Sequence, residues 1–170
     1  MAQDKHSLHS SKREEYVEYI FLAKLCSYGW SKDRFVEVAR AQTDAFGYDV
    51  VLGSGEITRH VQLKASVEGG RTARQKISKL LRDKQSGCVI WLKINPDTLK
   101  PSKYGWFGGK PNEAIPNLGS KPSKHTKANA QGEKGFRTNH LDVSWADFTK
   151  LSTIEQVFQH LFGATQIGEN

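Results

Sequence analysis

The chain has 170 residues, of which 25 are Lys or Arg and 18 are Asp or Glu, so its formal net charge is +7. This length fits one domain with a sizeable core, and neither a membrane-spanning apolar run nor a secretory amino terminus is present. Two cysteines far apart predict reduced thiols, and the scattered histidines without a CxxC do not have zinc-ligand spacing. We therefore expect one cytoplasmic domain over residues 1–170.

The excess positive charge is concentrated in two blocks. Residues 1–44 carry seven basic and seven acidic side chains, whereas residues 59–84 carry eight basic against two acidic, and residues 100–140 have the same ratio. Basic blocks on an otherwise balanced chain indicate a polyanionic partner, because Lys and Arg neutralise phosphates. Nucleic acid is the partner that this pattern predicts, and a generic solvated surface is the alternative.

The amino-terminal part predicts one amphipathic helix. Residues 1–10 show no periodicity and are predicted to be a disordered tail. Residues 12–28 predict a helix that ends at Gly29, because six side chains form a continuous apolar arc at about 100° per residue (Val17, Ile20, Phe21, Leu22, Leu25 and Tyr28). Glu18 falls inside this arc, where a carboxylate must reach solvent, pair with a base or help to bind a metal ion. Glu14 also lies within the arc and Glu15 at its edge, so both stay open as alternatives.

Three strands are expected to follow this helix. Residues 35–40 alternate between apolar and polar side chains, as a half-buried strand does. Residues 48–52 and 57–65 are rich in β-branched and apolar side chains and are separated by glycines at residues 53–55. This arrangement predicts a β-hairpin.

The hairpin would bring polar side chains to one of its ends. Because side chains in a strand alternate with a period of two, Gln62 and Lys64 share one face, whereas Val61 and Leu63 share the other. Asp49 lies near the far end of the partner strand. An acid, an amide and an ammonium group are thus expected together, and a divalent metal ion would satisfy all three. The alternative is an amphipathic hairpin with solvated Gln and Lys side chains.

The second half of the chain predicts a basic helix over residues 71–84 and a strand over residues 88–94 that is covered on both faces. Residues 98–139 have no apolar periodicity and are predicted to be a long basic loop or insert, with three aromatic side chains near its start that could stack on nucleic acid (Tyr104, Trp106 and Phe107). The alternative for this insert is that it shields a sheet edge. A last strand within residues 141–148 precedes a helix with a capping box at residues 152–155, and residues 164–170 are expected to be a disordered tail.

The pattern of Asp49, Gln62 and Lys64 resembles the core motif of the PD-(D/E)xK nuclease superfamily, in the variant with Gln where Glu is usual. Nucleases of this superfamily often begin with a helix that places a Glu beside the metal, and Glu18 followed by the turn at Gly29 matches that layout. The order of predicted elements also matches. The resemblance therefore implies a single α/β domain with a restriction-endonuclease-like αβββαβ core, in which a mixed central sheet is flanked by helices.

The same resemblance implies an enzyme, a divalent-metal-dependent endonuclease that hydrolyses phosphodiester bonds of DNA and is similar to small restriction, resolvase or homing nucleases. Asp49, the side-chain oxygen of Gln62, the carbonyl oxygen of Leu63 and Glu18 would hold Mg²⁺, for which Mn²⁺ would substitute. Lys64 would orient or deprotonate the attacking water. The Gln at position 62 removes one negative charge from the site, which should weaken metal binding.

Seven basic side chains are predicted to contact nucleic acid: Arg71, Arg74, Lys76, Lys79, Lys121, Lys124 and Lys127. Two other functions stay open, namely a catalytically silent nucleic-acid-binding module of the same fold and a nuclease directed at RNA. No membrane partner is expected. Cutting both strands of a duplex would favour a homodimer.

Overall fold

The computed structural model of the protein describes residues 2–125 and 128–164. The helices are α1 (Ala2–Leu8), α2 (Ser10–Ser31) and α3 (Ile154–Phe162). The strands are β1 (Glu37–Arg40), β2 (Val50–Ser54), β3 (Ile57–Val67), β4 (Arg74–Ser78), β5 (Gly87–Ile94), β6 (Pro101–Gly108), β7 (Pro122–Lys124), β8 (Phe136–Ser144) and β9 (Thr149–Leu151). Three short 3₁₀ helices lie between them: η1 (Asp44–Phe46), η2 (Lys79–Asp83) and η3 (Trp145–Asp147).

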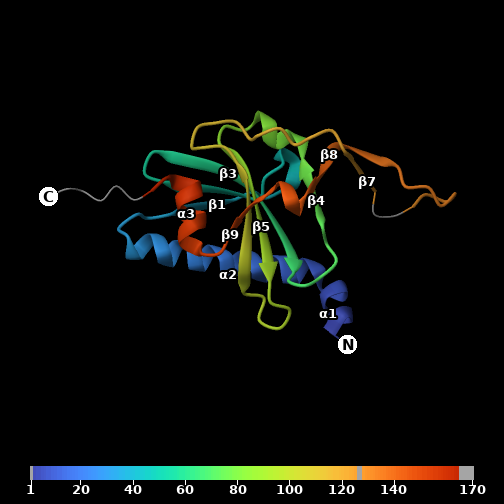
Figure 1. Ribbon diagram of the computed structural model, residues 1–170, viewed down its shortest axis with the longest axis horizontal. Helices are drawn as coiled ribbons and strands as arrows, with labels where there is room; N and C mark the ends of the chain where they lie inside the picture. Colours follow the sequence, from blue (N-terminus) through green and yellow to red (C-terminus); the bar gives the residue numbers. More distant parts are fainter. Residues whose placement is uncertain (1, 126–127, 165–170) are drawn as a thin grey trace.

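Two sheets make up the fold (Figure 1). The larger sheet has six strands in the order β1-β2-β3-β5-β6-β9, and it is mixed because β3 and β5 run parallel while the other neighbours are antiparallel. The smaller, antiparallel sheet has the order β4-β8-β7. The predicted mixed sheet within one α/β fold is therefore confirmed.

The larger sheet is covered on both faces. One apolar cluster packs α2 and α3 against it, through residues such as Phe21, Leu25 and Phe158. The other cluster joins it to the smaller sheet, through residues such as Ile77 and Leu141. Alternate residues of β5 enter the two clusters, and the strand predicted at residues 88–94 is confirmed as covered on both faces.

The predicted hairpin is present, with its first strand two residues later than predicted and its second strand beginning at Ile57 as predicted. Strands β2 and β3 pair so that Ser54 faces Ile57, and Gly55 adopts a positive φ of 60° in the turn. Val61 lies in the cluster beneath α2, and Leu63 packs against the same cluster. Because alternate side chains point to opposite faces, Gln62 and Lys64 point to the side of the smaller sheet.

The amino-terminal helix is longer than predicted at both ends. Residues 2–8 form α1 and are not a disordered tail, and α2 begins at Ser10 and continues through Gly29 to Ser31. Gly29 is buried, and a Cβ there would clash with the carbonyl oxygen of Arg34, which donates its own N–H to the Gly29 carbonyl at 2.9 Å. This glycine therefore permits the close approach of the chain after the helix and does not end the helix.

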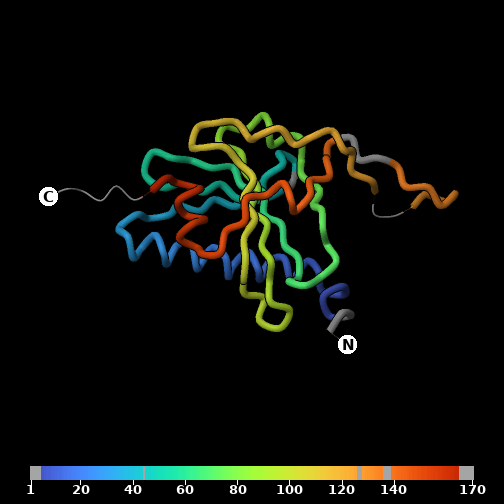
Figure 2. The backbone as a smooth tube through the Cα atoms, viewed as in Figure 1, coloured from blue at the N-terminus to red at the C-terminus, as the bar shows by residue number. Residues whose placement is uncertain are grey.

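The helix predicted over residues 71–84 is wrong. The chain forms β4 and then η2 there, and β4 pairs with β8 from Arg74 opposite Ser144 to Ser78 opposite His140. The apolar spacing of this segment suits either structure, since Ile77 and Leu81 are buried here as the helix would also require. The segment is a strand because β8, from the far end of the chain, pairs with it. Figure 2 shows this pairing as green and orange segments lying side by side.

The interpretation of residues 98–139 as an unstructured insert is also wrong in part. Its first section is β6, an inner strand between β5 and β9, and β7 and the start of β8 follow. Tyr104, Trp106 and Phe107 are buried in the two apolar clusters and cannot stack on nucleic acid. Both faces of β6 carry apolar groups, which removes the alternation that would have marked it as a half-buried strand.

The carboxyl-terminal predictions hold with small shifts. The strand predicted within residues 141–148 is the end of β8, which begins earlier, at Phe136, and β9 is a further strand after η3. The capping box of α3 is formed by Thr153 and Gln156, one residue later than predicted, and Gly163 ends the helix with a φ of 76°. Residues 165–170 of the predicted tail lie outside the described residues.

The predicted thiols are confirmed, because Cys26 and Cys88 are both free. Complete burial raises the pKa of Cys88 to about 12, so its thiol stays protonated at neutral pH. No helix within the described ranges has the length and apolar character that crossing a bilayer requires.

Candidate functional site

A cleft of about 670 Å³ lies between α2, the open end of the β2–β3 hairpin and the smaller sheet. Its lining includes every side chain that the hairpin and helix patterns singled out: Glu14, Glu15, Glu18, Asp49, Gln62, Leu63 and Lys64. Arg40, Tyr48, Arg74, Lys76, Ser78 and His140 are among the other residues that line it. Residues from the amino-terminal helix and from two separate sheets thus meet in one concave site.

Asp49 lies at the point where β2 separates from β3. Its N–H donates to the carbonyl of Val61 at 2.9 Å, and its Oδ2 accepts a hydrogen bond from the N–H of Leu63 at 2.6 Å. The regular pairing of β2 with β3 ends at Val50 and Val61, and beyond it the Asp49 carboxylate accepts the Leu63 N–H as a strand carbonyl would. In an antiparallel pair, the N–H and C=O of one residue point to the same neighbour. The Leu63 carbonyl oxygen thus lies along the strand edge that also carries Asp49.

Gln62 and Lys64 reach the cleft from the face of β3 that is turned toward the smaller sheet. Gln62 is only 7% exposed, and its Oε1 accepts a hydrogen bond from the N–H of Ser78 at 3.2 Å. That bond fixes the amide and orients its oxygen, which has a second lone pair for another partner. Lys64 follows two residues later and is half-buried.

Of the three glutamates on α2, Glu18 is the most enclosed. Its side chain is 17% exposed, against 35% for Glu15 and 66% for Glu14. Glu18 Oε1 lies 2.6 Å from Nε of Arg40, the last residue of the edge strand β1. The carboxylate that fell inside the apolar arc thus faces the cleft and is paired there with a cation.

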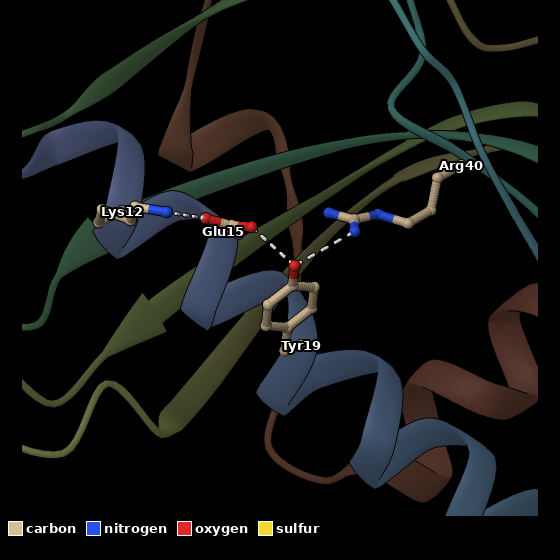
Figure 3. Close-up of polar contacts among 4 residues, drawn as sticks. All are labelled: Lys12, Glu15, Tyr19 and Arg40. Atoms are coloured by element: carbon tan, nitrogen blue, oxygen red, sulfur yellow. Dashed lines mark hydrogen bonds and ion pairs between the residues drawn. The ribbon is translucent and has the colours of Figure 1, made fainter.

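Glu15 belongs to a chain of polar contacts that runs from Lys12 through Tyr19 to Arg40 (Figure 3). Its carboxylate accepts a hydrogen bond from the Tyr19 hydroxyl at 2.7 Å and one from Lys12 Nζ at 3.1 Å. These two bonds, that from Tyr19 first, lower the pKa of Glu15. The Tyr19 hydroxyl in turn accepts from Arg40 at 3.5 Å, and the Arg40 guanidinium lies 5.0 Å from the Tyr19 ring centroid.

The donor atoms at the cleft suit a hard cation. Asp49 and Glu18 provide carboxylate oxygens, and Gln62 and Leu63 provide an amide and a peptide oxygen. Mg²⁺ takes oxygen ligands and retains several waters, so four protein donors or fewer are enough. Within the part of the chain that the structure describes, no three His, Cys, Asp or Glu side chains form a group that could hold a metal by themselves.

The predicted nucleic-acid contacts gather around the smaller sheet. Arg71 precedes β4, Arg74 and Lys76 are on β4 and line the cleft, Lys79 begins η2, and Lys121 and Lys124 are exposed at β7. Lys76 Nζ donates to the carbonyl of Lys124 at 2.7 Å, across β8. Two basic blocks that are far apart in the sequence therefore share one small sheet. Lys127 lies outside the described residues.

The sequence alone did not point to several polar residues that line the cleft, Arg40 and His140 among them. Arg40 had a local signal, because it ends a strand whose alternation was recognised, but its ion pair with Glu18 depends on how α2 crosses the sheet. His140 is in register with Ser78 across β8 and β4. No local pattern could have found it, since the pairing joins segments from two parts of the chain.

Comparisons of the chain with protein-family models, with curated proteins and with solved structures found no match.

Proposed function

We propose that the chain is a Mg²⁺-dependent endonuclease that hydrolyses phosphodiester bonds of DNA, with a restriction-endonuclease-like core of the PD-(D/E)xK type. One observation carries the proposal: Glu18, Asp49, Gln62, Leu63 and Lys64 line the same cleft although they come from three separate elements. In a passive amphipathic hairpin an acid, an amide and an amine would not be expected to gather opposite a carboxylate whose side chain is only 17% exposed, because each polar group costs free energy to desolvate.

Asp49, Gln62, Leu63 and Glu18 would hold the metal through oxygen atoms. When bound there, Mg²⁺ would offset negative charge on the phosphate and lower the pKa of water, as it does in other hydrolytic sites. Asp49 would be orientated for this by its bond to the Leu63 N–H, and Gln62 by its bond to the Ser78 N–H. Both side chains would thus keep their positions while the substrate binds.

Lys64 would act on the water and the phosphate. It extends from the same face of β3 as Gln62, so its ammonium group can orient the attacking water and offset the charge that develops on the phosphorus oxygens. Arg74 and Lys76 line the neighbouring wall of the cleft and would bind the flanking phosphates. The basic residues at β7 extend this surface along the smaller sheet.

A nicking assay on plasmid DNA with Mg²⁺ tests the proposal. Lys64→Ala and Asp49→Ala should each lower the cleavage rate by at least about 10³-fold while duplex binding, measured without divalent metal, stays within a few-fold of the parent. Lys100→Ala is the matched control, because Lys100 is an exposed lysine that does not line the cleft. Cleavage by both cleft variants at the parental rate would refute the hydrolytic role.

A silent binding module is the second candidate, and one feature favours it. One oxygen of Glu18 is close to Arg40 and one oxygen of Asp49 accepts the Leu63 N–H, so both carboxylates already have partners within the chain. If bound DNA stays intact with both Mg²⁺ and Mn²⁺, the binding module is the correct function. The same assay with single-stranded RNA distinguishes a nuclease directed at RNA, which would cleave the RNA faster than duplex DNA.

A further inference from the structure

An exposed aromatic side chain lies beside the cleft, on the segment that leads into Asp49. Phe46 is 55% exposed, and its ring stacks on Tyr48 with centroids 6.5 Å apart and planes inclined by 25°. Tyr48 lines the cleft, and its ring packs against that of His60 with centroids 4.9 Å apart and planes inclined by 71°. We refer to the stacked rings of Phe46 and Tyr48 as the aromatic shelf.

The aromatic shelf is fixed to the site by its neighbours. Gly47, between the two rings, is buried with a φ of 82°, and a Cβ there would lie 2.6 Å from the Ser78 hydroxyl oxygen. Ser78 is the residue whose N–H holds Gln62. The backbone between the rings therefore packs directly on the segment that orients a predicted ligand, and the shelf is part of the site's framework.

A cation accompanies the rings. Lys84 Nζ lies 5.2 Å from the ring centroid of Phe46 and 5.8 Å from that of Tyr48, so its ammonium group interacts with both. The Phe46 ring therefore lies beside both the Tyr48 ring and this cation, and it remains more than half exposed. A preorganised ring beside positive charge is the arrangement with which proteins bind an unstacked nucleobase and its phosphate together.

The position of the aromatic shelf next to Asp49 indicates which nucleotide of the substrate would contact it. Asp49 follows Tyr48 directly, so a base on the shelf belongs to a nucleotide next to the phosphate in the cleft. In a fully paired duplex the faces of that base are covered by its neighbours, and exposing one costs a few kcal/mol, least for a mismatched or unpaired base. A stacking shelf at this place therefore favours substrates in which the base is already loose.

We propose that the aromatic shelf is a base-stacking subsite, and that the enzyme prefers DNA with an unpaired or mismatched nucleotide beside the cleaved phosphodiester over fully paired duplex. This inference rests on the proposed nuclease function. The predicted stacking residues Tyr104, Trp106 and Phe107 are buried and offer no such surface, whereas Phe46 of the shelf is 55% exposed.

The test compares kcat/KM for two short duplexes that differ only by one mismatch at the cleavage position. The parent should prefer the mismatched duplex, and Phe46→Ala should lower that preference by about 5- to 150-fold, the range expected for losing one base–aromatic stack. Phe46→Trp should retain the preference, because the indole also stacks. Trp30→Ala is the matched control, since Trp30 is 73% exposed and contacts the Phe35 ring at a tilt of 40°, outside the cleft lining.

An unchanged preference in Phe46→Ala would overturn the inference while leaving the nuclease proposal intact. If the parent cuts neither duplex, the nuclease proposal fails, and the shelf is then tested by binding alone. For that purpose the mismatched base is 2-aminopurine, whose fluorescence is quenched on stacking. Quenching by the parent and by Phe46→Trp but not by Phe46→Ala supports the subsite, and equal signals from all three contradict it.

Discussion

Two cations on the same strand have opposite surroundings in this molecule. Arg59 and Lys64 both lie on β3, but Arg59 is fully buried among protein carbonyls, whereas Lys64 lines the cleft. The Arg59 guanidinium donates to the carbonyls of His160 and Leu161 at the end of α3, and to those of Gly109 and Lys110. It also lies 5.3 Å from the ring centroid of Trp106.

This difference separates basic side chains that stabilise the fold from basic side chains that are exposed to solvent. Arg59 neutralises the negative end of a helix dipole and satisfies carbonyls that α3 leaves without intrahelical partners. Arg34 does the same for Phe162 and Gly163, at 2.7 and 2.9 Å. Around the cleft, by contrast, basic side chains from β4 and β7 extend over an exposed sheet. Net charge alone counts both groups, and only the second is exposed for the nucleic-acid binding that we propose.

The largest expected effect follows from removing the buried cation. Arg59→Leu should lower the free energy of unfolding by about 3–5 kcal/mol, because four carbonyls lose a charged donor in a buried position. Urea denaturation measures this change. Arg82→Leu, at an exposed arginine of η2, should change the stability by no more than about 0.5 kcal/mol. Equal denaturation midpoints for the two variants would show that Arg59 does not secure α3.

Breaking the ion pair between Arg40 and Glu18 should change metal affinity more than stability, in contrast to the removal of Arg59. Arg40→Ala should change stability by less than about 1 kcal/mol, since the Arg40 side chain is 47% exposed and solvent screens the pair. It should nevertheless tighten Mg²⁺ binding by about tenfold, because the Glu18 carboxylate loses its competing cation. Calorimetric titration with Mg²⁺ measures this affinity, and Glu18→Gln should weaken it. Weaker binding by Arg40→Ala would mean that Glu18 does not face the metal.

Removing one basic side chain from the smaller sheet should have a smaller effect. Arg74→Ala should weaken duplex binding a few-fold, and it should reduce the slope of log K against log salt by about one, because one phosphate contact is lost. Binding measured at several salt concentrations gives this slope. The same substitution at Arg82 is the control, since that residue does not line the cleft. Identical slopes for both variants would remove β4 from the nucleic-acid surface.

The smallest expected effect concerns the rim of the cleft. The hydrogen bond from Tyr19 favours the charged form of Glu15 and lowers its pKa, so any stability it contributes is present above the unfolded-state pKa and is lost as pH falls through the folded-state value. Tyr19→Phe should therefore raise the pKa of Glu15. Carboxyl chemical shifts followed through a pH titration measure this change, and an unaltered pKa would show that the Tyr19 hydroxyl does not contribute to it.

By itself the sequence determined the elements whose signals are local. The apolar arc of α2, the period of two in β3 and the apolar run of β5 each lie within one segment, and they located Glu18, Gln62 and Lys64 on defined faces. Asp49 could be predicted because a short hairpin brings its two strands together whatever surrounds them.

Only the tertiary structure decided the features that depend on partners distant in the chain. Residues 74–78 became a strand because β8 was available to pair with them, and Tyr104 and Trp106 became core because β6 lies inside the larger sheet. Likewise Arg40 and His140 joined the cleft through packing and register. The physical reason is that hydrogen-bonded pairing and burial are properties of the whole fold, and a short segment with an ambiguous period takes the structure that its neighbours complete.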